Sequence, residues 1–232
     1  MKKYKASIDS LYHGSAVDGK GLRCVVFFNG CNLRCGFCHN PETLYVPGKE
    51  MELEELVARL LRYKPYIRKG GVTLSGGEPF LQAEFCKALM ARLKEEELGV
   101  CIETNGYITD PEMIALAESI LLDVKNQDQP IAPQLAGFLQ TCAQVGTPVC
   151  LTNVLVPGCN DDAEHLRALY RLRQSSPCVQ ALKFLPFRKL CVHKYEELGR
   201  EYPYEQFAEA SAEDIRQAKA LLEQIARQGE QI

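Results

Sequence analysis

The sequence lacks the long apolar runs of membrane proteins, because a spanning helix needs about 18 or more consecutive apolar residues and no run approaches that length. It also lacks a signal-peptide core, since the basic residues 1–5 are followed by the polar segment 6–10. These absences predict a protein that is neither exported nor inserted into a membrane. We therefore expect a cytoplasmic location.

Concentrated basic charge is also absent. The formal net charge is −3, and acidic and basic residues are interspersed along the chain, so no basic face for a nucleic-acid backbone is expected. No internal repeat or low-complexity linker divides the 232 residues. We predict one domain over 1–232, with a core at about 20–186 and a C-terminal loop and helix at 187–232, and we expect a monomer.

The cysteine usage does not predict a disulfide framework, because the count of 11 is odd and many of these residues lie inside apolar runs. Three thiols nevertheless fall within eight residues, as Cys31, Cys35 and Cys38. A four-iron, four-sulfide cubane needs one thiolate per iron, so three cysteines leave one iron free to bind another molecule. A closed zinc site is the alternative, with His39 as fourth ligand, but no second C-x2-C pair exists and His39 directly follows Cys38.

The other eight cysteines show no ligand spacing, and we expect most of them to be buried or inert thiols. They are Cys24, Cys86, Cys101, Cys142, Cys150, Cys159, Cys178 and Cys191.

The apolar pattern predicts six strands that alternate with six helices. The strands are expected at 22–28, 72–74, 100–102, 120–124, 149–154 and 179–184, and the helices near 53–61, 83–97, 111–118, 133–144, 162–174 and 212–227. Strict alternation with short connections indicates an α/β fold with a parallel sheet and right-handed crossovers. Six units are too few for a closed eight-stranded barrel, so either a partial barrel or a doubly wound open sheet fits the pattern.

Polar segments follow four of the predicted strands. They are the cysteine segment, residues 75–78, residues 103–106 and Lys125. Because parallel α/β folds build their sites at the carboxyl ends of strands, these segments should meet at one mouth. Residues 187–210 form a longer connection than usual, and connections of that length are more often functional than idle.

These motifs carry a resemblance to a known family. The cysteine segment, Ser75-Gly76-Gly77-Glu78-Pro79, Val17-Asp18-Gly19 and the later Thr-Asn-Gly, Leu-Asp-x-Lys and Val-Pro-Gly segments together resemble radical S-adenosylmethionine (SAM) enzymes, more narrowly the glycyl-radical-enzyme activases of the pyruvate formate-lyase-activating type. The resemblance implies a partial (β/α)6 barrel, one 4Fe–4S cluster on Cys31, Cys35 and Cys38 as the catalytic centre, and SAM as cofactor. The chain has no cysteine-rich insert after His39, which predicts a single cluster.

The resemblance also assigns roles to individual residues. It gives cofactor contacts to Phe37, Cys38, His39, Gly76, Gly77, Glu78, Asp123, Lys125 and Arg188. In this assignment Glu78 pairs with the ammonium of SAM, Lys125 with its carboxylate, and Phe37 lies beside the adenine. Arg188 stands where relatives often have histidine. From the residues alone, the glycines form a turn, and Glu78 and Lys125 are solvated side chains.

Two further sites follow from the resemblance. A monovalent cation is implied at Glu103, Thr104, Asp123 and the backbone of Leu121, although relatives often have aspartate in place of Glu103. The alternative is that these acids cap the turns that follow them. Asp18 is expected to face the glycine-bearing segment of the partner, together with residues 187–210, although Lys20 replaces the usual proline in its loop.

The implied activity is reductive cleavage of SAM and abstraction of hydrogen from a glycine of a glycyl-radical enzyme such as pyruvate formate-lyase, with a flavodoxin- or ferredoxin-like electron donor. Three alternatives stay open at this point. They are a radical SAM enzyme with a small-molecule substrate, a non-catalytic iron–sulfur carrier or zinc-binding module, and an activase of anaerobic ribonucleotide reductase, although that group is generally shorter.

Overall fold

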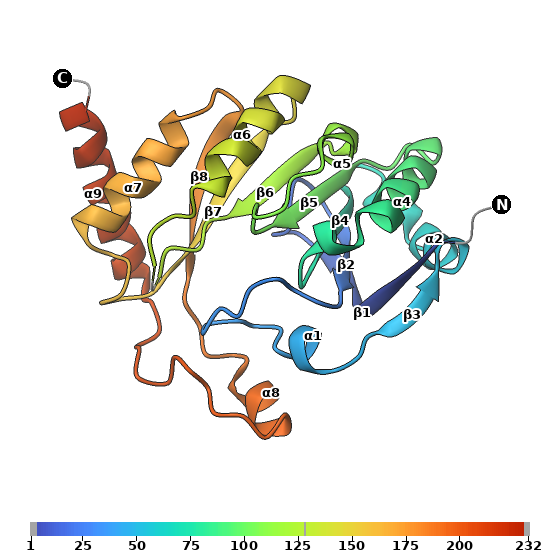
Figure 1. Cartoon of the computed structure of the whole chain (residues 1–232), viewed down its shortest axis with the longest axis horizontal. Helices are drawn as coiled ribbons and strands as arrows, with labels where there is room; N and C mark the ends of the chain where they lie inside the picture. The colour runs from blue at the N-terminus through green and yellow to red at the C-terminus, as the bar shows by residue number, and fades with distance from the viewer. Residues whose placement is uncertain (1–3, 128, 230–232) are drawn as a thin grey trace.

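A computed structural model describes residues 4–127 and 129–229 of the chain. Its centre is one sheet with the strand order β3-β1-β2-β4-β5-β6-β7-β8 (Figure 1). The strands are β1 (Lys5–Ser15), β2 (Arg23–Phe28), β3 (Lys49–Glu52), β4 (Gly71–Gly76), β5 (Val100–Thr104), β6 (Ser119–Asp123), β7 (Val149–Leu155) and β8 (Val179–Pro186).

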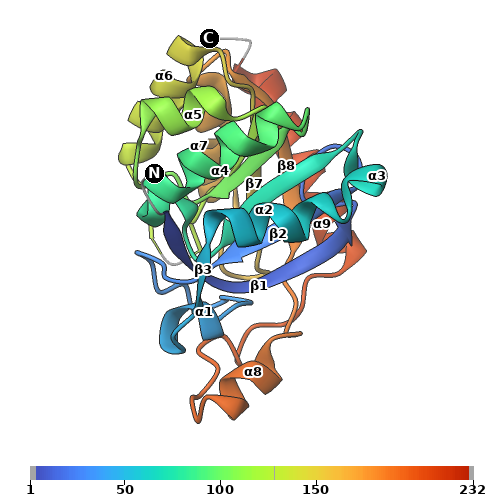
Figure 2. The same cartoon turned by 90° about the vertical axis from the view of Figure 1, so that its right-hand side faces the viewer.

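Six of these strands are the predicted ones, and they are all parallel. β2 pairs with β4, and the parallel pairing continues through β5, β6 and β7 to β8. The predicted α/β fold with a parallel sheet is therefore confirmed. The sheet curves as a partial barrel, with helices covering its outer face (Figures 1 and 2).

The sequence reading missed two antiparallel strands, β1 and β3. β1 pairs with β2 from Ile8 to Ser15 and with β3 from Lys5 to Ile8, so these two strands extend the sheet beyond β2. Most of β1 is exposed or half-buried, and β3 is only four residues long. Because neither strand has the continuous apolar run of a fully buried parallel strand, the apolar pattern of the sequence does not predict them.

The six predicted helices are present with ends shifted by a few residues. They are α2 (Leu53–Leu61), α4 (Ala83–Glu95), α5 (Pro111–Leu116), α6 (Gln134–Val145), α7 (Ala163–Gln174) and α9 (Ala212–Gly229). Short helices were not predicted: α1 (Glu42–Tyr45), α3 (Lys64–Ile67), α8 (Val192–Glu197) and the 3₁₀ turn η1 (Pro79–Gln82). Helices of four to six residues contain too few turns to display a periodic apolar face. The sequence predicts α5, also six residues long, with Pro111 in its first turn.

Two helices show how the local sequence sets a buried face and a starting point. α2 buries Leu53, Leu56, Val57 and Leu60, the predicted apolar stripe. α5 begins with Pro111 after the cap Asp110, whose carboxylate accepts the backbone N–H of Met113 at 2.9 Å.

The buried apolar side chains form two clusters. The larger one fills the space between the sheet and the helices that cover it. The smaller one joins the cysteine segment to residues 187–210, and α1 and α8 lie at this same end of the molecule in both views (Figures 1 and 2). Within the described residues, no helix is both long and apolar enough to cross a membrane.

Candidate active site

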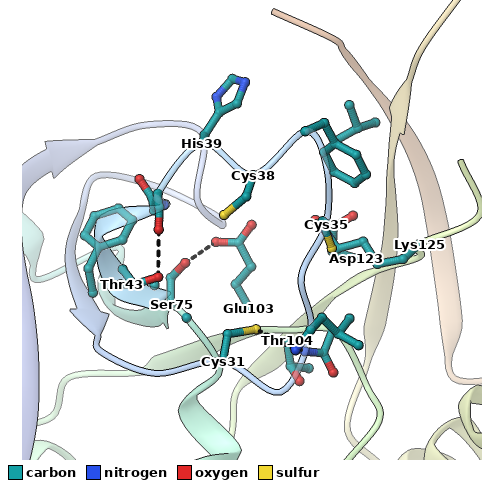
Figure 3. Close-up of a pocket in the computed structure, with 18 of the residues that line it drawn as sticks. Cys31, Cys35, Cys38, His39, Thr43, Ser75, Glu103, Thr104, Asp123 and Lys125 are labelled. Atoms are coloured by element: carbon teal, nitrogen blue, oxygen red, sulfur yellow. Dashed lines mark hydrogen bonds and ion pairs between the residues drawn. The ribbon is translucent and has the colours of Figure 1, made fainter. Parts of the chain in front are cut away.

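The cysteine segment is the loop that leaves β2. Gly30 begins it with φ +93°, a conformation that favours glycine, and its N–H donates to the carbonyl of Thr43 at 2.8 Å. The N–H of Cys38 donates to the carbonyl of Cys35 at 3.1 Å, which makes a tight turn between the last two thiols. Cys31, Cys35 and Cys38 are all half-buried and line one cavity (Figure 3).

This cavity has a volume of about 400 Å³, within the range of small-ligand sites. Besides the cysteine loop, its walls come from the ends of β4, β5 and β6, through Ser75, Glu103, Thr104 and Asp123 (Figure 3). Lys125 follows β6 and lines the same space. The predicted convergence of the segments that follow the strands is therefore what the structure shows.

Gly76 and Gly77 line the cavity and also lie against the backbone that leads into the cysteine loop. A Cβ on Gly77 would lie 1.9 Å from the carbonyl oxygen of Gly30, and one on Gly76 would lie 2.3 Å from the backbone nitrogen of Phe28. Gly76 also has φ +107°, which side chains rarely adopt. Because any side chain would push these backbones apart, the two glycines set the distance between β4 and the start of the cysteine loop.

Glu78 lies behind this wall and not in it. Its side chain has no exposed surface, and it is absent from the residues that line the cavity. One carboxylate oxygen accepts from the Thr104 hydroxyl at 2.8 Å and the other from the N–H of Asn105 at 2.9 Å. In this structure the Glu78 carboxylate is bonded to protein donors, and its contact with the SAM ammonium, implied by the resemblance, stays a prediction.

Burial raises the pKa of Glu78, while the hydrogen bonds from Asn105, Thr104 and Phe80 oppose that shift. A buried carboxylate with such donors fixes the positions of the loops that supply them. Glu78 thus joins the loop after β4 to the loop after β5.

Asp123 and Lys125 form an ion pair beside Phe37. The Lys125 ammonium contacts the Asp123 carboxylate and lies 4.9 Å from the centre of the Phe37 ring. Burial by itself lowers the pKa of Lys125, but the charges of Asp123, Cys35 and Glu103 and the hydrogen bond to Asp123 outweigh this effect. The net pKa is therefore raised above the ordinary lysine value, and the side chain is a cation. The second oxygen of Asp123 is buried and has no hydrogen-bond partner among the described residues, so it has capacity for a ligand.

Glu103 and Thr104 lie on β5 opposite β6, where Glu103 is in register with Leu121. The Ser75 hydroxyl donates to the Glu103 carboxylate at 2.5 Å. Burial raises the pKa of Glu103 to about 7, a shift that the Ser75 hydrogen bond opposes and the charge of Asp123 increases. Leu121 itself is buried and does not line the cavity.

Burial also raises the pKa of two of the cysteine thiols. The pKa of Cys38 reaches about 11, and that of Cys31 is raised as well, with the N–H of Leu33 opposing the shift. Iron binding must therefore displace protons from thiols that are neutral in the metal-free chain. In residues 4–127 and 129–229, no three His, Cys, Asp or Glu side chains form a ready-made metal site. None of the eleven cysteines, all of which lie in the described residues, forms a disulfide, and five of the eight outside the loop are buried.

Asp18 reaches the cavity from the side where the strands begin. Its carbonyl accepts the hydroxyl of Thr73 at 2.6 Å, and its carboxylate accepts the hydroxyl of Ser15. Thr73 and Ser75 point to the same face of β4 because strand side chains alternate. The Asp18 loop is bonded to Thr73, two residues before Ser75 on the same face of β4, and Asp18 also lines the cavity.

His39 and Arg188 meet outside the centre of the site. His39 lines the cavity, and its Nε2 donates to the carbonyl oxygen of Arg188 at 2.8 Å. The guanidinium of Arg188 instead donates to the carbonyl of Ala210 and lies 3.8 Å from Glu209. Arg188 does not line the cavity, and its contact with the adenine stays a prediction.

The sequence reading did not single out Asn105 and Ser75 as site side chains. The amide of Asn105 donates to Asn32 at 2.8 Å and lies 3.9 Å from the sulfur of Cys31. Ser75 orients Glu103, as described above. Both residues belong to the quoted motifs, so the signal was present, but their contacts depend on loops that only the fold brings together.

Known proteins with similar sequences are radical SAM enzymes. Residues 25–124 match the model of the radical SAM superfamily. The chain is 38% identical over 208 residues to the pyruvate formate-lyase-activating enzyme of Clostridium pasteurianum, covering 84% of this chain and 87% of that relative. The chain belongs to the family of pyruvate formate-lyase-activating enzymes within the radical SAM superfamily. The enzyme of the same name from Staphylococcus epidermidis is 36% identical, with 94% of each chain covered.

Solved structures support the fold of this radical SAM chain. A radical SAM methyltransferase from Sphaerobacter thermophilus superposes with a TM-score of 0.62 over 88% of this chain and 64% of its own, at 18% identity. A domain of a pyruvate formate-lyase-activating enzyme from Bacteroides vulgatus gives a TM-score of 0.52 at 19% identity, over 68% of this chain and 95% of that domain. At such identities these structures speak for the architecture alone.

Proposed function

We propose that the chain is an activase that abstracts a hydrogen atom from a glycine of a partner glycyl-radical enzyme, using one 4Fe–4S cluster and SAM. The observation that carries this proposal is that the three cysteines of the loop line one cavity with the acids and the lysine at the strand ends. Three thiolates are the ligand number of a cubane that keeps one iron open. The family relationship supports the same activity. Because the relatives from Clostridium pasteurianum and Staphylococcus epidermidis are named as activating enzymes of pyruvate formate-lyase, we propose that enzyme as the partner.

The donor set fits the cluster. Thiolate sulfur is the ligand that iron–sulfur clusters use, and Cys31, Cys35 and Cys38 leave one iron for a cofactor. When bound, the cluster and SAM supply the one-electron chemistry that cleaves a carbon–sulfur bond and provides a carbon radical. The protein's part is to hold, orient and shield these groups.

We assign the cofactor contacts as follows. Lys125 offers the cation for the SAM carboxylate, since it lines the cavity and keeps its proton. Gly76 and Gly77 offer backbone groups beside the cysteine loop, and Phe37 and His39 form the wall on the far side of Cys38. Asp123 contributes its unpartnered oxygen. Glu78 supports this site from behind through Thr104 and Asn105.

A monovalent cation at Glu103, Thr104, Asp123 and the Leu121 carbonyl is part of the proposal. Support comes from three side chains of this set lining one cavity and from the unpartnered oxygen of Asp123. A cation there would compensate the buried charges of the two acids. Its test is a potassium titration of SAM cleavage, in which no dependence on potassium or sodium contradicts the assignment.

We further propose a flavodoxin- or ferredoxin-like electron donor, a monomeric activase and a cytoplasmic location. Asn32 and Arg34, between the first two cysteines, are exposed, so a donor can approach the cluster loop from outside. A chain in which none of the eleven cysteines forms a disulfide is consistent with a reducing compartment.

The activity is tested with anaerobically reconstituted protein, SAM, a one-electron reductant and pyruvate formate-lyase. We expect about four irons per chain, and a partner glycyl radical whose electron paramagnetic resonance (EPR) splitting changes when the partner contains deuterated glycine. A chain that holds the cluster and cleaves SAM but leaves no radical on the partner would point to a small-molecule substrate. Stoichiometric zinc and no iron would overturn the whole proposal.

A further inference from the structure

The second apolar cluster lies against the cysteine loop. Residues 187–210, here called the C-terminal strap, supply six of its eight buried members: Phe187, Cys191, Tyr195, Tyr202, Tyr204 and Ala210. The cysteine loop supplies Phe37, the residue between the last two thiols, which is 6% exposed. The strap therefore packs on the loop about 150 residues earlier in the chain, with its own small core.

Tyr204 is the aromatic residue of the strap that contacts Phe37 of the cysteine loop. Its ring lies edge-on to Phe37, with ring centres 5.8 Å apart, and packs on Phe187 and Phe207 as well. A Cβ on Gly36 would lie 2.2 Å from one carbon of the Tyr204 ring and 2.4 Å from another. The Tyr204 ring thus occupies the space that a side chain at the residue after Cys35 would fill.

Polar contacts tie the strap to the loop at the residues that follow. The ammonium of Lys194 donates to the carbonyl of His39 at 3.0 Å and to the Asn40 side chain at 3.2 Å, and it pairs with Glu42 at 2.5 Å. The Tyr195 hydroxyl donates to the carbonyl of Cys38 at 3.3 Å. These bonds hold the backbone directly after the last thiol.

The cysteine loop has little secondary structure of its own to fix its shape, since residues 29–40 contain no helix or strand. Ordering such a loop costs conformational entropy that packing must offset. We infer that the C-terminal strap is the element that holds the cysteine loop in the conformation that binds the cluster, with Lys194 and Tyr204 as positioning residues. The inference rests on the proposed ligation of a cluster by Cys31, Cys35 and Cys38.

The first test compares Lys194→Met with Lys87→Met under anaerobic conditions. Lys87 is a matched control, because it too has three acceptors, the carboxylates of Glu84, Asp110 and Glu112, but it lies on α4 and outside the cavity lining. Both reconstituted proteins are treated with an iron chelator. Because groups that orient metal ligands typically change metal affinity about 10- to 100-fold, we expect iron loss from Lys194→Met to be at least about 10-fold faster than from wild type.

Lys87→Met should lose iron at the wild-type rate. The EPR spectrum of the reduced cluster, with and without SAM, should change in Lys194→Met and not in Lys87→Met. Lys194→Arg, which keeps the charge and the donors, should move both readouts back toward wild type. Equal iron loss and unchanged spectra in the two methionine variants would overturn the inference.

The second test uses the Gly36 and Tyr204 contact. Gly36→Ala adds a methyl group where the ring lies, and Tyr204→Ala removes the ring, so each should accelerate iron loss. Because residues in contact are coupled, the double variant should be less impaired than the product of the two single effects. If the two effects simply multiply, the ring does not set the loop's conformation.

Failure of this inference can be told apart from failure of the proposed function. Wild-type protein that never takes up four irons would contradict the cluster assignment. Wild-type protein that holds the cluster, with strap variants that hold it equally well, would contradict only the positioning role.

Discussion

The carboxylate of Glu78 accepts the backbone N–H of Asn105 at 2.9 Å, although the two residues follow different strands. The Asn105 side chain in turn lies against Asn32 and the sulfur of Cys31. A fully buried acid, placed outside the cavity, thereby supports a loop that touches the first thiol. Because Glu78 is bonded to protein groups, its replacement should affect the stability of the fold as well as the site.

We expect Glu78→Ala to destabilise the fold as well as the site. It would leave the N–H groups of Asn105 and Phe80 and the Thr104 hydroxyl without their acceptor. A buried polar group that loses its partner costs about 1–3 kcal/mol, so thermal unfolding should shift by several degrees. Far-UV circular dichroism measures this shift. Weaker SAM binding with an unchanged melting temperature would instead indicate a direct cofactor contact.

Gly77→Ala should prevent stable folding of the site, because its methyl group would lie 1.9 Å from the carbonyl oxygen of Gly30. The matched control is Gly137→Ala on α6, where a Cβ meets nothing within 4 Å. That variant should gain about 0.5–1 kcal/mol, since alanine is the better helix former. Iron content after reconstitution and denaturant unfolding measure both effects. A Gly77→Ala protein with full iron content and normal stability would show that the two backbones can separate freely.

Asp18→Ala should leave the cluster content and SAM binding near wild-type values and lower the yield of glycyl radical on the partner. Asp18 lines the cavity, and a hydrogen bond from a substrate to a charged group is worth about 1.5–3 kcal/mol. Isothermal titration with a peptide containing the partner's glycine measures the loss, about 10- to 150-fold in affinity. Unchanged peptide affinity and radical yield would remove Asp18 from the partner site.

Asp162 provides a test of pH dependence away from the site. Its carboxylate caps α7 by accepting the N–H groups of Glu164 and His165, and the bond from His165 is the main reason that its pKa is lowered from the ordinary 3.8. Because the folded pKa lies below the unfolded one, the stabilisation is complete above the unfolded pKa and is lost as pH falls through the folded value. Asp162→Ala should cost about 1 kcal/mol at neutral pH.

The difference in unfolding free energy between wild type and Asp162→Ala should shrink as the pH is lowered below the ordinary aspartate range. Asp162→Asn is the control, since asparagine caps a helix without titrating. Urea unfolding at a series of pH values measures all three proteins. A gap that stays constant down to acid pH would show that the charge of Asp162 plays no part in the cap.

The sequence by itself determined the parallel sheet. Continuous apolar runs such as residues 24–28 and amphipathic stretches such as Leu53–Leu61 alternate along the chain, and alternation with short connections allows few other arrangements. It also determined that Cys31, Glu103 and Lys125 share one cavity, since the carboxyl ends of parallel strands meet at one edge. Both results depend on patterns within short windows.

The tertiary structure alone decided where the side chains of Glu78 and Arg188 point. Both follow strands, as the pattern predicts, but Glu78 is bonded to Thr104 and Asn105 behind the wall, and Arg188 to Ala210. The contact of Tyr204 with Gly36 was likewise invisible in the sequence. A motif fixes which residues approach a site, but the direction of each side chain depends on donors and packing partners supplied by distant segments, and only the complete fold brings these together.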